Sequence, residues 1–130
     1  EQFLRAVSTA LDMGQQMKKP EPILRIEQKQ FLLEYELKQI RYIESFGKRL
    51  VLHSISQGEE LADQISGYSL MRLLELAGKD NLIQCHKSFL INPIFIKKID
   101  KGAKALWLKD CKETIPIGEK YQHNLRERAL

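Results

Sequence analysis

The chain lacks the features that mark membrane proteins and disulfide-rich secreted proteins. No apolar run approaches the length that crosses a bilayer, and no secretory signal opens the sequence. Only two cysteines are present, Cys85 and Cys111, which is too few for a disulfide framework. Two cysteines suit a reducing compartment, so we expect a cytoplasmic protein with two buried free thiols; a redox pair is the alternative.

Signatures of catalysis and of metal binding are also missing. The sequence has no glycine-rich phosphate loop, no nucleophile elbow and no run of metal ligands. Cys85 and His86 would point to opposite faces of a strand, and no second pair has the spacing of a zinc site. His86 and Ser88 would share a face, but at roughly twice the ~3 Å that a nucleophile and its base require, and no acid is nearby. We therefore expect no enzyme, no metal and no small-molecule cofactor.

The composition is that of an ordinary globular domain, but its charge is unevenly distributed. Hydrophobic residues make up 43% of 130 residues, enough for one domain with one core, and the net charge is +4. Residues 86–130 contain ten Lys and Arg and five Asp and Glu, whereas residues 1–85 contain eleven Lys and Arg and twelve Asp and Glu. A basic C-terminal third fits contact with a polyanion, although lysines that only confer solubility would produce the same imbalance.

Hydrophobic periodicity predicts a linker helix followed by a mainly β domain. Apolar residues recur at helical spacing from Phe3 to Leu11, and Pro20 and Pro22 end the pattern. We interpret residues 1–20 as a linker from a preceding domain, and we expect the chain to be a piece of a longer protein. Strands are predicted at Ile23–Ile26, Phe31–Tyr35, Ile40–Ser45, Arg49–His53, Glu60–Ile65, Leu82–Cys85, Phe89–Ile91, Ile94–Ile96, Ala105–Leu108 and Thr114–Ile117.

Two further helices are predicted within this domain. Leu70, Leu73, Leu74 and Ala77 form an apolar stripe that Ser69 can cap and Gly78 can close. The tail is expected to end in a helix, because Tyr121, Leu125 and Ala129 also recur at helical spacing.

The predicted turn at His86, Lys87 and Ser88 places three hydrogen-bond donors between two buried strands. Lysine can bond to guanine O6 and N7, while serine and histidine reach phosphate oxygens or base edges. An ordinary polar turn would use the same residues, so the chemistry of this turn leaves both interpretations open.

Three motifs, in order between Ile23 and about Leu125, resemble the LytTR family of bacterial DNA-binding domains. Ile40–Ser45 with Gly47 and Lys48 is similar to the family opening I-x-Y-I-E-S-x-G-K. Cys85–Asn92 is similar to its signature C-H-K-S-F-x-V-N, and Ile115–Gly118 with Lys120 and Tyr121 to its closing I-P-I-G-x-K-Y.

This resemblance implies an elongated fold of about ten strands in small antiparallel sheets with short helices, covering residues 23–130. It also implies sequence-specific binding to double-stranded DNA by the effector of a response regulator that controls transcription. Relatives act downstream of a phosphorylated receiver domain, typically in quorum sensing by Gram-positive bacteria. Their loops enter successive major grooves, often as two copies, a dimer on direct repeats.

Carried over by position, the DNA contacts fall in three loops and one further site. The residues are Lys48 and Arg49, then His86, Lys87 and Ser88, then Gly118, Glu119, Lys120 and Tyr121, with Lys109 outside the loops. The expected readers of bases are Lys48, Arg49, Lys87 and His86, and Ser88, Lys109 and Lys120 are expected to contact phosphates. Glu119 departs from the family, which often has Arg there.

Two rival functions and several single residues remain open. A protein-interaction domain that docks an acidic partner is the alternative; basic side chains clustered on one edge would instead favour DNA. RNA binding is disfavoured because no aromatic platform is present. Trp107 is interpreted as either a second-layer core residue or a partner surface, and Glu44 as either orienting the first loop or facing water. His53 is expected to be structural and His123 to be solvated.

Overall fold

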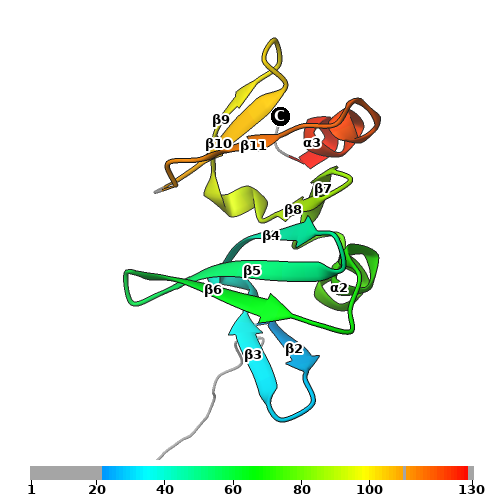
Figure 1. Cartoon of the computed structure of the whole chain (residues 1–130). Helices are drawn as coiled ribbons and strands as arrows, with labels where there is room; N and C mark the ends of the chain where they lie inside the picture. Colours follow the sequence, from blue (N-terminus) through cyan, green and yellow to red (C-terminus); the bar gives the residue numbers. More distant parts are fainter. Residues whose placement is uncertain (1–21, 110, 129–130) are drawn as a thin grey trace, which may run out of the picture.

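The computed structural model describes residues 22–109 and 111–128, so the predicted linker helix, residues 1–20, lies outside the described residues. The described chain is mainly β, as predicted, with ten strands in three small antiparallel sheets and few short helices (Figure 1). The sheets follow one another along the long axis of the molecule, and none of the described helices has the length and hydrophobicity of a membrane span.

The first sheet is a hairpin of β2 (Ile23–Glu27) and β3 (Leu32–Glu36). Strict alternation along β2 buries Leu24 and Ile26 and exposes the residues between them. A single 3-10 turn, η1 (Leu37–Gln39), then leads into the central sheet.

The central sheet has five strands in the order β6-β5-β4-β8-β7. Its middle strand, β4 (Ile40–Phe46), pairs with β5 (Arg49–Ser56) on one side and with β8 (Phe89–Ile91) on the other. The edges are β6 (Glu59–Ile65) and β7 (Ile83–His86). The strands predicted at Ile40–Ser45 and Arg49–His53 form a hairpin that turns at Gly47, and the strand predicted from Glu60 begins one residue earlier.

Helix α2 (Leu70–Ala77) lies between β6 and β7 in sequence and forms as predicted. The Ser69 hydroxyl accepts the Arg72 N–H at 3.1 Å, which satisfies a free donor of the first turn. Gly78 closes the helix with a positive φ of 95°.

The third sheet consists of β9 (Ile96–Asp100), β10 (Ala105–Leu108) and β11 (Thr114–Pro116), followed by η3 (Glu119–Tyr121) and α3 (Gln122–Arg128). The predicted strand at Ile94–Ile96 is wrong: Pro93–Phe95 forms a 3-10 turn, η2, and β9 begins at Ile96. The cause is local, because the Asn92 side chain accepts the Ile94 N–H at 3.2 Å and offers the backbone an alternative to a strand ladder.

The single core expected from the chain length is divided into two clusters, one on each face of the central sheet. Ile43 of β4 belongs to the cluster under α2, whereas its neighbour Tyr42 belongs to the cluster under the third sheet. Successive strand residues point to opposite faces, so one strand supplies both cores. Cys85 is buried in the second cluster, but Cys111 is only half-buried, and both thiols are free.

Candidate nucleic-acid interface

Three turns that carry predicted contact residues lie along one edge of the molecule, on the right of Figure 1. They are the β4–β5 turn at Gly47 and Lys48, the β7–β8 turn at Lys87 and Ser88, and the segment from Gly118 to Tyr121. Strand pairing and backbone hydrogen bonds hold these turns next to one another.

Pairing of β4 with β8 brings the first two turns together. The strands are antiparallel with Glu44 opposite Phe89, and the Ser45 N–H donates to the Ser88 carbonyl at 2.9 Å. Lys48 and Lys87 are therefore exposed on one shallow groove, which Tyr68 and Met71 also line. The two lysines are far apart in sequence, and only the sheet places them on one surface.

The first turn separates Lys48 from Arg49. Gly47 takes a φ of +58°, which a glycine adopts without strain, so two residues suffice to reverse the chain. Arg49 lies at the start of β5 and lines a second groove together with Lys29 and Gln64. Lys29 and Gln64 were not predicted as site residues, because no sequence signal relates the turn before Phe31 to Arg49.

The second turn fixes the orientation of His86. The His86 Nδ1 accepts the Ser88 N–H at 3.1 Å, so in the neutral ring Nε2 carries the proton and remains a donor. Phe89 contacts the imidazole edge-on, with 5.7 Å between ring centroids. The half-buried His86 is thus held by packing and by a hydrogen bond, while Lys87 is exposed.

His86 ends a row of four rings that crosses the central sheet. His53 stacks on Tyr42 with 4.1 Å between the ring centroids. The Tyr42 centroid lies 6.4 Å from that of Phe89, whose ring contacts His86. At the far end of the row, His53 Nε2 is 2.5 Å from a carboxylate oxygen of Glu44. Glu44 therefore neither orients the first loop nor simply faces water, and His53 is structural, as predicted.

The third segment is bound to the second turn through glycine. The Gly118 N–H donates to the Cys85 carbonyl at 2.8 Å. A Cβ on Gly118 would lie 3.0 Å from the Tyr121 ring and 3.6 Å from the His86 ring, so a side chain at this position would require the Tyr121 ring to shift by a few tenths of an ångström. Gly118 and the half-buried Tyr121 are thus packing residues of the site, whereas Lys120 is exposed.

Glu119 carries a negative charge at this edge, and an ion pair offsets it. The Lys104 Nζ lies 2.5 Å from the Glu119 carboxylate, and this hydrogen bond holds the pKa of the carboxyl below its ordinary value. The pair brings no net positive charge to the edge.

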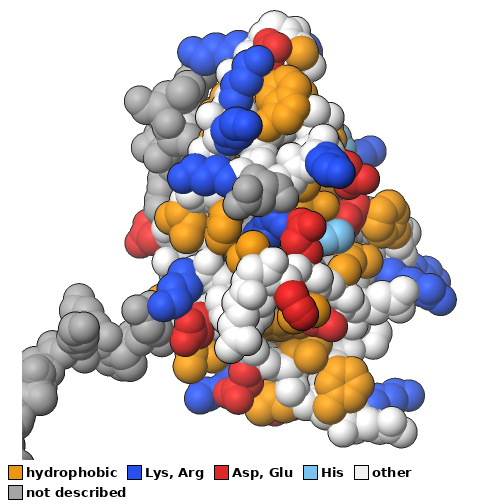
Figure 2. Space-filling view, turned by 90° about the vertical axis from the view of Figure 1, so that its left-hand side faces the viewer, with side chains coloured by type: hydrophobic (Ala, Val, Ile, Leu, Met, Phe, Trp, Pro, Cys, Tyr) orange, Lys and Arg blue, Asp and Glu red, His pale blue; other side chains and the backbone are white. Residues whose placement is uncertain are grey.

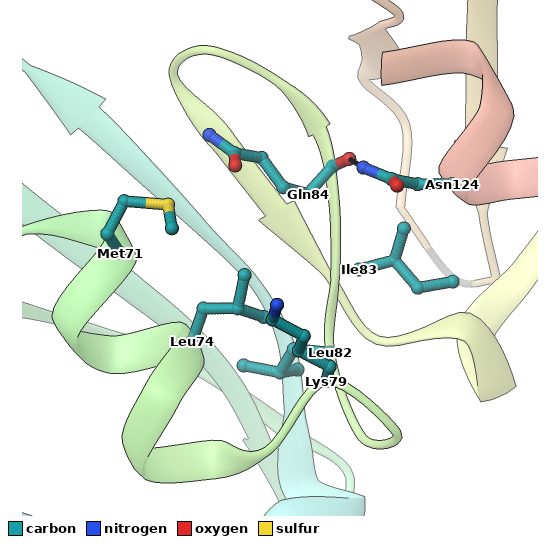
Figure 3. Close-up of a pocket in the computed structure, with 7 residues that line it drawn as sticks. All are labelled: Met71, Leu74, Lys79, Leu82, Ile83, Gln84 and Asn124. Atoms are coloured by element: carbon teal, nitrogen blue, oxygen red, sulfur yellow. Dashed lines mark hydrogen bonds between the residues drawn. The ribbon is translucent and has the colours of Figure 1, made fainter.

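Strand β7, which leads into the second turn, is held between two helices. Figure 3 shows the pocket that separates α2 from β7, lined by Met71, Leu74, Lys79, Leu82, Ile83, Gln84 and Asn124. On the other side of β7, the Asn124 amide donates to the Gln84 carbonyl at 2.8 Å and fixes α3. The turn is therefore presented on a supported strand.

Lys109 is the one predicted contact that the fold does not bring to this edge. It is exposed at the β10–β11 connection, on the left of Figure 1, and its N–H donates to the Phe95 carbonyl at 2.7 Å. Its carbonyl accepts from Arg41, at the end of β4 opposite Gly47. A phosphate contact by Lys109 stays a prediction.

Comparisons with known proteins agree with the predicted resemblance. The family model for the LytTr DNA-binding domain matches residues 30–129. A solved LytTr DNA-binding domain, from a protein described as a methyl-accepting/DNA response regulator of Bacillus cereus, is similar in structure. The two chains are 26% identical with a TM-score of 0.64, and the match covers 82% of this chain and 94% of the other. No curated protein matches the chain.

Proposed function

The chain belongs to the LytTr DNA-binding domain family, and on that basis we propose that it binds a specific sequence in double-stranded DNA and controls transcription. It would act as the effector of a response regulator in the cytoplasm, joined to a receiver domain through residues 1–20. We propose no catalytic role. Binding as two copies on direct repeats, under a quorum-sensing signal, completes this proposal.

The observation that carries the proposal is the position of three donor-bearing turns on one edge. Exposed Lys48, Lys87 and Lys120 come from three separate segments, and backbone hydrogen bonds join those segments. A row of turns along an elongated molecule suits contact with successive grooves of a duplex better than contact with a compact ligand.

Within this edge, different residues would have different tasks. The ammonium of Lys87 and the Nε2–H of His86 are donors on a supported turn, and guanine O6 and N7 are acceptors in the major groove. We assign base reading to these two residues and to Lys48 and Arg49, and phosphate contact to Ser88 and Lys120. Gly118 lies close to the rings of Tyr121 and His86, and we assign no base contact to Gly118 or Tyr121.

The test is selection of bound duplexes from a random library, followed by competition between the selected duplex and a scrambled one. We expect a recovered consensus and an affinity for it at least about a thousandfold above the scrambled duplex, the lower end for specific binders. Equal affinities for the two duplexes would contradict sequence-specific recognition. No binding to either duplex, by a folded chain, would contradict the DNA function itself.

A further inference from the structure

The face opposite the three turns carries a second basic surface. Figure 2 views the molecule from the left-hand side of Figure 1, and Lys and Arg side chains gather over its upper part around hydrophobic ones. The exposed lysines without an ion pair in the corresponding segments, β9 and the connections on either side of β10, are Lys97, Lys98, Lys101, Lys109 and Lys112, and Glu113 is exposed next to Lys112. Together with Trp107 these five lysines are called here the Trp107 surface.

Trp107 lies beside Lys98 on this surface. Its neighbours Leu106 and Leu108 are buried in the second core, so alternation along β10 turns Trp107 to the opposite, outer face of the sheet. The indole is half-buried and belongs to neither core cluster, so the interpretation of Trp107 as a core residue is wrong. Across the strands it pairs with Lys98 on one side and Thr114 on the other.

Lys98 covers the indole without neutralising the positive charge of the surface. Its Nζ lies 4.8 Å from the ring centroid, which is a cation–π contact. Among the described side chains of residues 22–109 and 111–125, none of the five lysines of the surface makes an ion pair. The carboxylate of Asp100 is already engaged, because it accepts the Ala103 N–H at 2.9 Å.

This surface does not belong to the DNA edge. It lies on the outer face of the third sheet, whereas the three turns lie along the right-hand edge of Figure 1. The lysines of this surface are alike in charge, so two copies that docked through this same face would repel each other. A solvent-accessible tryptophan beside a lysine is a candidate anchor for a protein interface, because tryptophan is enriched among the residues that contribute most to binding.

We propose that the Trp107 surface docks an acidic segment of another protein, with an apolar side chain of that segment against the indole and its carboxylates on the lysines. The partner would bind while the three turns hold DNA. The inference goes beyond the proposed function and does not depend on it, since it rests on the charge and exposure of a different face.

The sequence supplies a direct readout, because Trp107 is the only tryptophan in the chain. The probe is a twelve-residue peptide of alternating glutamate and leucine, which has no aromatic residue. Titrated into the whole chain, it should change the tryptophan emission in a saturable way, and added salt should weaken the binding. A matched peptide with lysine in place of glutamate should leave the emission unchanged.

A second peptide and a charge-reversed variant locate the contact. A peptide with alanine in place of leucine should bind at least about fivefold more weakly, because it has no apolar side chain to set against the indole. The double variant Lys98→Glu, Lys101→Glu should lose at least about tenfold in affinity for the leucine peptide and keep its affinity for duplex DNA. Lys87→Ala should lose affinity for duplex DNA and keep its affinity for the leucine peptide. Circular dichroism verifies the fold of each variant.

Three results would overturn the proposal. Unchanged emission with the leucine peptide would show that the surface does not dock acidic segments. Equal binding of the leucine and alanine peptides would show charge attraction without an indole contact. Equal losses of peptide and duplex affinity in the double variant would show that this face contacts DNA.

Discussion

The guanidinium of Arg41 donates from Nη2 to the main-chain carbonyl of Lys109 at 2.8 Å, across 68 positions of sequence. Arg41 is almost wholly buried on β4, and its Nη1 pairs with the exposed carboxylate of Glu60. The third sheet is thus joined to the central sheet by a charged hydrogen bond as well as by apolar packing. The Nε of Arg41, by contrast, is buried without a hydrogen-bond partner among the described residues.

Removal of this contact should destabilise the domain. Arg41→Ala leaves the Lys109 carbonyl without its donor, and hydrogen bonds to charged groups contribute about 1.5–3 kcal/mol, so we expect a loss of about that size in the free energy of unfolding. Urea unfolding followed by circular dichroism measures it. Glu60→Gln is the control, expected to cost under about 1 kcal/mol because Glu60 is exposed. Equal losses in the two variants would assign the effect to the ion pair.

Binding to duplex DNA should depend strongly on salt. If about six phosphates are neutralised per copy, the logarithm of the binding constant should fall against the logarithm of salt concentration with a slope of about −5. Fluorescence anisotropy of a labelled duplex over a series of salt concentrations gives this slope. A slope near zero would contradict DNA binding by the basic edge.

Lys87 and Lys120 should differ in what they contribute to binding. Lys87→Ala removes a base contact, so it should cost about 1–3 kcal/mol on the selected duplex and much less on a scrambled one. Lys120→Ala removes a phosphate contact, so it should weaken both alike and lower the salt slope by about one. Competition titration measures the two affinities. An unchanged affinity ratio in Lys87→Ala would leave base reading to Lys48, Arg49 or His86.

The ring of Phe89 should influence recognition without touching DNA. Phe89→Leu keeps an apolar side chain but removes the edge contact with His86, so it should lower affinity for the selected duplex more than for the scrambled one. The matched control is Phe95→Leu, at another half-buried phenylalanine against the same core. A loss of specificity in both variants would indicate a general effect on packing.

The two thiols should differ in reactivity. Burial raises the pKa of the Cys85 thiol from 9.0 to about 12, so this thiol stays protonated at pH 8. Cys111 is only half-buried, so a reagent can reach it in the folded chain. At pH 8, a disulfide reagent should modify Cys111 quickly and Cys85 only on unfolding, which mass spectrometry of the labelled peptides resolves. Because an unfolded thiol ionises first, the free energy of unfolding should also fall as the pH rises from about 9 towards 12. Rapid labelling of Cys85 in the folded chain would contradict its burial.

Much of the secondary structure could be predicted because its causes lie within a few residues. The positive φ at Gly47, the cap at Ser69 and the alternation along β2 each depend on near neighbours. The error at Ile94–Ile96 has an equally local cause, since the Asn92 side chain closes a turn where hydrophobicity alone favours a strand. The hydrophobic pattern favours a strand there, whereas the Asn92 side chain favours a turn, and the structure adopts the turn.

The sequence by itself determined which residues could contact DNA, through their donors and their place in motifs, and it determined the mainly β class. Only the tertiary structure decided which of them share a surface. Pairing of β4 with β8 puts Lys48 beside Lys87, folding of the first hairpin puts Lys29 beside Arg49, and the third sheet carries Lys109 to the other side. Such pairings join segments distant in sequence, and their stability comes from cores assembled from the whole chain, so no local pattern encodes them.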